Sequence, residues 1–221
     1  MTSEPSLGRP VVLIGRYASP YVRRVALCMH FQRVPYEIVI TSPLTEPDRV
    51  ADYNPIGRVP VLVLGDGRRL IESSAIIDYL QDLVPLERRL IPPPGDARVA
   101  VLQATAIMTN AIEKAIYASY ETSRRPPDKQ HEPYRSSLLA QVSAALTMLE
   151  AQVSSSWFVG QDLTLADITV AVGWRFLRFA ASDVARTDLF AGLASHAARC
   201  EATSEFQACQ PETYNDRAGP N

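Results

Sequence analysis

A serine next to a proline, Ser19-Pro20, lies where a side chain could act on an anion. The apolar run before it, 11–14, is rich in β-branched residues and is bounded by Pro10 and Gly15, which predicts a buried strand. Proline suits the first turn of a helix, and serine suits the N-cap. Because a helix N-terminus carries free N–H groups and partial positive charge, Ser19 could stabilise a thiolate there. The simpler alternative is that Ser19 only caps its helix.

Three further stretches follow Ser19 along the chain. In 54–62, a turn at Asn-Pro is followed by Arg and then by an apolar strand that starts at Val-Pro. Asp66-Gly67 is a two-residue hairpin signal. In 72–80, Glu-Ser-Ser-Ala-Ile passes from a strand into a helix. Together with the Ser-Pro-Tyr at the first helix, this combination resembles the cytosolic glutathione transferase family, and in particular its serine-type, bacterial-like members.

The resemblance implies that Ser19 donates its hydroxyl to the thiolate of glutathione. A free thiol has a pKa of about 8.5, so it is mostly protonated at neutral pH and needs such a donor. Tyr17 is the rival, because other branches of the family use a tyrosine near the end of the first strand. Tyr17 alternatively lines the pocket or packs in the core.

The rest of the glutathione site also follows from the resemblance. It implies a cis bond between Val59 and Pro60 that turns the Val59 backbone towards the cysteinyl part of glutathione, although an edge-strand proline is the simpler reading. Glu72 would accept from the γ-glutamyl ammonium, and Ser73 would bind the neighbouring carboxylate, although Glu-Ser is also an ordinary helix start. Arg58 would pair with the glycine carboxylate, or is a solvated surface arginine.

The elements that position these residues predict an α+β domain followed by an all-α domain. Strand and helix signals alternate from 10 to 84, which fits a thioredoxin-like, glutathione-binding domain. The proline-rich segment 85–95 is the predicted linker. Helical periodicity then runs through 96–210, with Asp96 as a candidate N-cap, and the polar tail 211–221 is expected to fray.

Two features of the helical domain are singled out. Thr164 and Asp167 match the acidic variant of the capping box, which predicts a structural role for Asp167. Asn110 and Tyr117 fall on the first long helix of this domain, where the resemblance implies one wall of an interdomain pocket for the electrophile.

Composition limits the classes of partner. The formal net charge is −2, with 22 Lys and Arg against 24 Asp and Glu, which gives no reason to expect nucleic-acid binding. Three cysteines without metal-ligand spacing predict free thiols and no metal site, and the three histidines are expected on helix surfaces or loops. No signal peptide or membrane span is expected, so the predicted location is cytoplasmic.

The sequence therefore predicts a glutathione transferase, without a cofactor, in which glutathione attacks a hydrophobic electrophilic small molecule. The resemblance also implies a homodimer and a role in detoxification. Two alternatives stay open. One is a noncatalytic glutathione-binding or protein-interaction member of the fold, because fold does not guarantee chemistry. The other is a glutathione-dependent disulfide reductase, which is disfavoured because neither Ser19 nor Val22 is a cysteine.

Overall fold

The computed structural model describes residues 10–212, which form two compact units. The first unit contains 10–90 and 204–212, and the second contains 91–203. The boundaries thus differ from the predicted ones, because the last helix groups with the sheet and not with the other helices. Residues 1–9, where no signal peptide is expected, and the predicted tail beyond Glu212 lie outside the described residues.

The first unit is built on a four-stranded sheet in the order β2-β1-β3-β4. Its strands are β1 (Val11–Ile14), β2 (Tyr36–Val39), β3 (Val61–Val63) and β4 (Arg69–Ile71). β1 pairs with β2 in parallel and with β3 antiparallel, and β4 pairs antiparallel with β3. The apolar run that predicts a buried strand is therefore confirmed as a central one.

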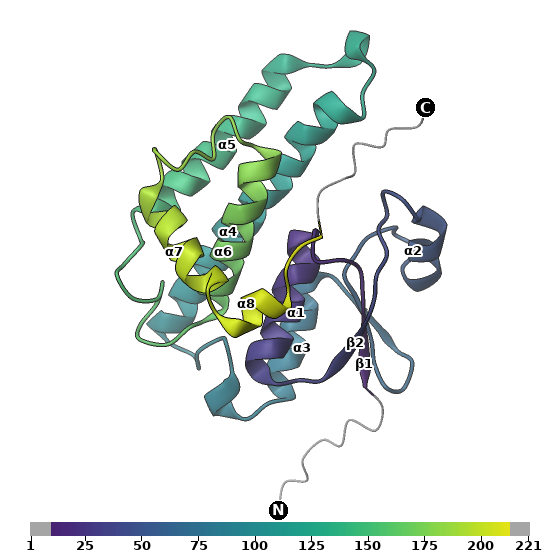
Figure 1. The fold of residues 1–221 in the computed structure, drawn as a ribbon, viewed down its shortest axis with the longest axis vertical. Coiled ribbons are helices and arrows are strands. Elements are labelled where there is room, and N and C mark those ends of the chain that lie inside the picture. Colours follow the sequence, from purple (N-terminus) through teal and green to yellow (C-terminus); the bar gives the residue numbers. More distant parts are fainter. Residues whose placement is uncertain (1–9, 213–221) are drawn as a thin grey trace, which may run out of the picture. The chain divides into compact units, whose positions relative to one another are not determined.

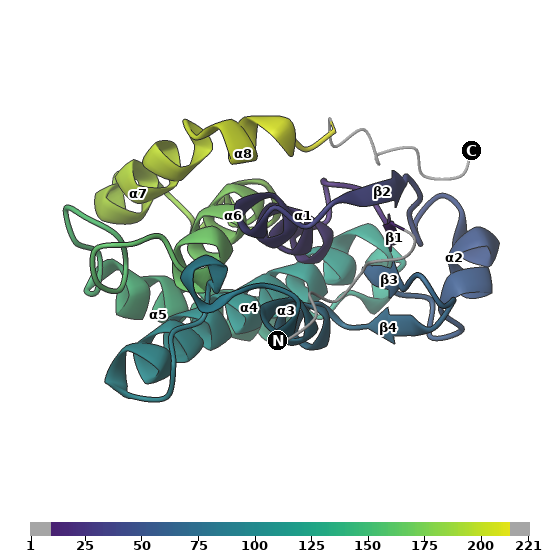
Figure 2. The ribbon, with the colours of Figure 1, turned by 90° about the horizontal axis from the view of Figure 1, so that it is seen from below.

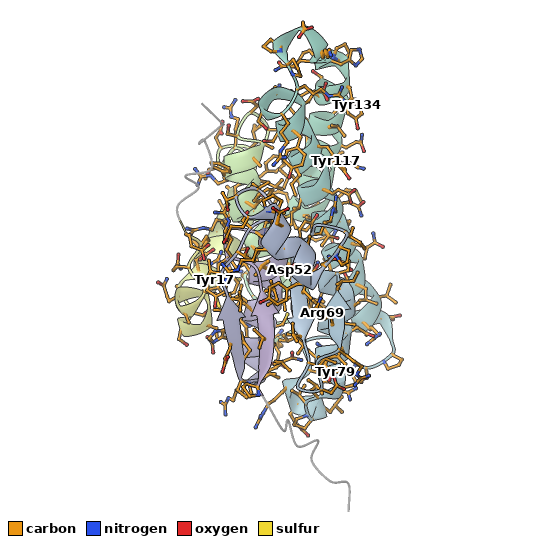
Figure 3. All side chains as sticks on the ribbon, turned by 90° about the vertical axis from the view of Figure 1, so that its right-hand side faces the viewer. Tyr17, Asp52, Arg69, Tyr79, Tyr117 and Tyr134 are labelled. Carbon is orange, nitrogen blue, oxygen red and sulfur yellow. The ribbon has the colours of Figure 1, made fainter. Side chains whose placement is uncertain are left out.

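Helices cover both faces of this sheet. They are α1 (Pro20–Gln32), α2 (Pro47–Tyr53), α3 (Ser73–Asp82), the short 3-10 helix η1 (Leu86–Arg88) and α8 (Ser204–Ala208). α1 and α3 pack together on one side of the sheet, and α2 lies on the other side (Figures 1 and 2). Arg69 of β4 donates to the carbonyl oxygens of Asp52 and Tyr53 in α2, and Figure 3 labels Arg69 beside Asp52. This arrangement is thioredoxin-like.

Three polar side chains of α1 are buried, although helical periodicity alone would predict that they lie mostly on a polar face. They are Arg23, Arg24 and Gln32. The reason is that β1, α3 and α8 all pack against α1, so the helix has more than one covered side. The guanidinium nitrogens of Arg24 have no hydrogen-bond partner among the described residues, and burial lowers the pKa of this group.

The second unit is helical, as predicted. Its helices are α4 (Asp96–Ser123), the 3-10 helix η2 (Pro127–Lys129), α5 (Glu132–Glu150), α6 (Leu165–Ala180) and α7 (Ala191–Glu201). α4 packs on α5 and α6, and a Cβ at Gly173 would lie only 2.3 Å from the Met108 sulfur, so this residue permits the close approach of α6 to α4. Asp96 is the first residue of α4 and not its N-cap, because Gly95 takes that place with φ +147°. None of the helices within 10–212 is long and apolar enough to cross a membrane.

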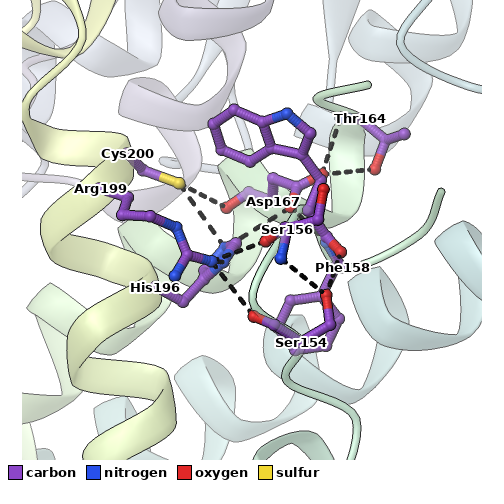
Figure 4. A network of polar contacts seen from close by, with 9 residues as sticks. Ser154, Ser156, Phe158, Thr164, Asp167, His196, Arg199 and Cys200 are labelled. Carbon is purple, nitrogen blue, oxygen red and sulfur yellow. Dashed lines mark hydrogen bonds and ion pairs between the residues drawn. The ribbon is translucent and has the colours of Figure 1, made fainter. Parts of the chain in front are cut away.

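Asp167 at the start of α6 has the structural role that its capping box predicts. Its carboxylate is fully buried and accepts from the Thr164 N–H and hydroxyl, each at 2.8 Å. It also accepts from the Phe158 N–H at 2.7 Å, which ties the preceding loop to the helix (Figure 4). Three donors thus depend on one carboxylate.

His196 on α7 lies beside this carboxylate, contrary to the predicted helix surface or loop. It is 1% exposed, and its Nε2 lies 3.7 Å from Asp167 Oδ1 and 3.6 Å from the Cys200 sulfur (Figure 4). Arg199, which can only donate, approaches Nδ1 at 3.3 Å, so Nδ1 accepts and the proton of the neutral ring is on Nε2. Burial lowers the pKa of His196 and raises that of Cys200 to about 12. These buried groups are therefore structural and not catalytic.

We predict that Asp167→Ala removes about 3 kcal/mol or more from the free energy of unfolding, because it leaves three donors without their charged acceptor. Urea titration measures this loss. Asp162→Ala is the control, since Asp162 is exposed in the same loop and should change stability by less than about 0.5 kcal/mol. Equal effects of the two substitutions would contradict the role of Asp167.

Stability should also fall below a pH of about 6.5. The unfolded chain takes up a proton at the ordinary histidine pKa of 6.5, whereas folded His196 resists it, so the unfolded state gains protons first as pH falls. We expect His196→Gln to flatten the plot of unfolding free energy against pH between 7 and 5. Burial also lowers the pKa of His30, so the wild type and His196→Gln share the part of the pH dependence that His30 causes. Parallel plots would show that His196 does not cause the slope.

Candidate functional site

Ser19 caps α1, as predicted. Its backbone is extended, with φ −74° and ψ 122°, and its hydroxyl oxygen accepts from the Val22 N–H at 3.4 Å. The Ser19 N–H donates to the Arg16 carbonyl at 3.0 Å, which closes the loop between β1 and α1. Because the hydroxyl accepts in this contact, its own proton can be donated to a further group. The side chain is half-buried, so a ligand atom can reach it.

The hydroxyl of Tyr17, the alternative donor to the glutathione thiol, is hydrogen-bonded to another tyrosine. The Tyr17 and Tyr36 hydroxyls share a hydrogen bond of 2.8 Å, and the Tyr36 hydroxyl lies 3.2 Å from His30 Nε2. The Cys209 thiol also contacts both phenols, and burial raises the pKa of Tyr17. Tyr17 is therefore part of a polar cluster between β2, α1 and the end of the chain. No sequence signal connected these four residues.

The peptide bond between Val59 and Pro60 is cis, as the resemblance implies. Pro60 is buried and Val59 is half-buried. The preceding turn is held by Asn54, whose side-chain N–H donates to the Arg58 carbonyl at 2.9 Å and whose side-chain oxygen accepts from the Ile56 N–H at 3.1 Å. Sequence reasoning gave Asn54 only a turn role. The Arg58 side chain is exposed, so its part in binding stays a prediction.

Glu72 has an unusual backbone at the start of α3. Its φ of +73° lies in the left-handed region, which costs a non-glycine residue roughly 1–3 kcal/mol and is common at ligand sites. One carboxylate oxygen accepts from the Ser74 N–H at 3.0 Å, and the other accepts from the Ser73 hydroxyl at 3.1 Å. Glu72 is exposed, so its remaining lone pairs can accept from a ligand, whereas Ser73 is buried.

The sheet register brings three of these segments to one end of the first unit. Ile14 at the end of β1 is opposite Val61 at the start of β3, and Val61 is opposite Ile71 at the end of β4. Ser19 follows the first of these positions, Val59-Pro60 precedes the second, and Glu72-Ser73 follows the third. A Cβ at Gly15 would lie 3.2 Å from Val59 Cβ, which shows how closely the first two segments approach.

The two residues predicted to line the electrophile pocket lie on α4 of the second unit. Asn110 is exposed, and its side-chain N–H donates to the Ala106 carbonyl at 2.9 Å. Tyr117 is half-buried. Their contact with a substrate stays a prediction. Within 10–212, no group of three or more His, Cys, Asp or Glu residues is arranged to hold a metal ion.

Two models of one protein family match most of the chain. Residues 13–88 match the glutathione S-transferase N-terminal domain, and residues 107–203 match the glutathione S-transferase C-terminal domain. The chain belongs to the glutathione S-transferase family. Ser19, Val59-Pro60 and Glu72-Ser73 all lie in the segment that matches the N-terminal domain of the family.

Individual family members are similar to most of the chain. An uncharacterized GST-like protein, YibF of Escherichia coli (strain K12), is 27% identical over 76% of this chain and 82% of its own length. Glutathione S-transferase GstA of Escherichia coli O157:H7 is 33% identical, over 52% of this chain and 54% of its own. A crystal structure of a glutathione S-transferase from Methylobacillus flagellatus KT with GSH bound has a TM-score of 0.84 and 29% identity, covering 91% of this chain and 100% of that one.

We predict that Tyr17→Phe keeps turnover of glutathione with an electrophile within about threefold of the wild type. The substitution removes a hydroxyl that bonds to Tyr36, and its cost should appear as about 1 kcal/mol of lost stability. Steady-state kinetics with glutathione and 1-chloro-2,4-dinitrobenzene, together with urea titration, measure the two effects. A loss of turnover of tenfold or more at unchanged stability would assign thiol activation to Tyr17.

Proposed function

We propose that the protein is a serine-type glutathione transferase, which ionises the glutathione thiol and transfers the sulfur to a small hydrophobic electrophile. The observation that carries this proposal is the gathering of Ser19, Val59-Pro60 and Glu72-Ser73 at one end of the sheet. Family membership supports the same assignment.

Ser19 and the start of α1 would supply thiol activation. The hydroxyl donates to the sulfur, and the α1 N-terminus adds partial positive charge, so both favour the thiolate. Each unit by which the thiol pKa falls corresponds to about 1.4 kcal/mol of preferential thiolate binding. The thiolate then forms a carbon–sulfur bond with the electrophile, which either loses a leaving group with its bonding electrons or, at an activated double bond, takes a proton from solvent.

The remaining residues would hold the ends of glutathione. Glu72 accepts from the γ-glutamyl ammonium, and Ser73 at the N-terminus of α3 binds the adjacent carboxylate. The backbone of Val59 pairs with the cysteinyl part, as an added strand would. The exposed Arg58 pairs with the glycine carboxylate. On the second unit, Asn110 and Tyr117 are proposed to contact the electrophile.

We further propose a cytoplasmic homodimer that acts in detoxification without a cofactor. Exposed apolar side chains on one face of α4 support an interface there, since Val99 and Leu102 are 65% and 42% exposed. Glutathione-dependent disulfide reduction is the weaker alternative. The three cysteines are free and buried, so none is available for exchange.

We predict that Ser19→Ala raises the pKa of enzyme-bound glutathione towards about 8.5 and lowers turnover at neutral pH by about tenfold or more. Ultraviolet difference titration of thiolate formation and steady-state kinetics measure the two effects. Tyr17→Phe is the matched control, because it removes the other side-chain hydroxyl of the same loop.

Two outcomes would contradict the proposal. An unshifted thiol pKa in the wild type with tight glutathione binding would favour the noncatalytic binding protein. If the pKa of bound glutathione stays low in Ser19→Ala, the backbone N–H groups of the loop, and not the Ser19 hydroxyl, activate the thiol.

A further inference from the structure

The loop that carries Ser19 is bound by a carboxylate from the other end of the chain. The Tyr17 N–H donates to Glu212 Oε1 at 3.3 Å, and the Ala18 N–H donates to Glu212 Oε2 at 2.9 Å. Both donors immediately precede Ser19. Hydrogen bonds to a charged acceptor are stronger than those to a neutral one, so Glu212 restrains this loop more firmly than a backbone carbonyl would.

The segment 204–212, which we term the C-terminal strap, is itself anchored on α1. Phe206 is fully buried and lies beneath the Arg23 guanidinium, whose carbon is 5.3 Å from the ring centroid. Arg23 Nε donates to the Cys209 carbonyl at 2.8 Å. Figures 1 and 2 both show α8 alongside α1. These contacts fix the C-terminal strap on α1 and so hold the Glu212 carboxylate next to the loop.

The C-terminal strap lies beyond both family models, the second of which ends at residue 203. The positions that those models describe therefore do not include Glu212. The loop also has bonds of its own, because the Gly15 N–H donates to Val39 and the Ser19 N–H donates to Arg16. Of the three N–H groups between these bonds, those of Tyr17 and Ala18 donate to Glu212.

We propose that Glu212 is a positioning residue for thiol activation, an inference that rests on the proposed function. It holds the N–H groups of Tyr17 and Ala18, and thereby fixes where the Ser19 hydroxyl meets the sulfur. A misplacement of about 1 Å in such a donor can cost up to about a hundredfold in rate. The negative charge of Glu212 would by itself oppose a nearby thiolate, so the sign of the change in thiol pKa separates positioning from simple electrostatics.

The test compares wild type, Glu212→Ala, Glu212→Gln and Glu37→Ala as full chains. We expect Glu212→Ala to raise the pKa of bound glutathione and to lower kcat by about tenfold, with a smaller change in KM for glutathione. Glu212→Gln keeps one acceptor oxygen and should recover part of the loss. Glu37→Ala removes the same charge from an exposed position on β2 and should match the wild type.

Amide hydrogen exchange provides a second readout that does not depend on activity. The Tyr17 and Ala18 amides should both exchange at least about tenfold faster in Glu212→Ala, and one of the two should do so in Glu212→Gln, whereas amides within β1 should keep their protection. Retention of the β1 protection also shows that the variants are folded.

The outcomes separate this inference from the proposed function. A wild type that does not lower the thiol pKa overturns the proposed function, while the exchange experiment still tests the contact. A wild type that lowers the thiol pKa, with both Glu212 variants unchanged in pKa and kcat, overturns the positioning role alone. A lower thiol pKa and faster turnover in Glu212→Ala would overturn it as well, because Glu212 would then act as an inhibitory charge.

Discussion

Every helix begins with backbone N–H groups that have no acceptor inside the helix, and this chain meets that constraint in two ways. At α6 the Thr164 side chain accepts from the Asp167 N–H, and the Asp167 carboxylate accepts from the Thr164 N–H in return, so this buried helix start is closed to ligands. At α1 the half-buried Ser19 makes one contact of 3.4 Å to Val22. The cap of α6 stabilises the fold. The cap of α1 leaves the Ser19 hydroxyl proton, and the partial positive charge of the helix N-terminus, able to interact with an anion.

Much of the architecture could be predicted because its signals are local. The apolar run of β1, the turn at Asp66-Gly67 and the capping box of Asp167 each depend on residues only a few positions apart. The burial of Arg23 and Arg24 could not be predicted, because helical periodicity assumes one covered face and α1 has several neighbours. The placement of 204–212 with the sheet depends on contacts across most of the chain.

The same distinction between local signals and distant contacts applies to the candidate site. Ser19, Glu72 and the cis bond at Pro60 follow from short motifs and a family resemblance. The direction of the Tyr17 hydroxyl does not, because it depends on Tyr36 across the sheet. The contact of Glu212 with the loop could not be predicted either, because no local sequence pattern around this glutamate indicates a partner so far along the chain. The motifs identify the donor, and distant contacts determine where it points.

Burial protects the cysteines of this chain from chemical modification. Cys28, Cys200 and Cys209 are all buried, and burial raises their pKa values to about 12, 12 and 11. Alkylation and oxidation require an accessible thiolate. The folded chain therefore presents no cysteine thiolate of its own to a reactive compound. In the proposed reaction the sulfur that reacts belongs to glutathione, which is replaced after each turnover, so the cysteines of the protein are spared.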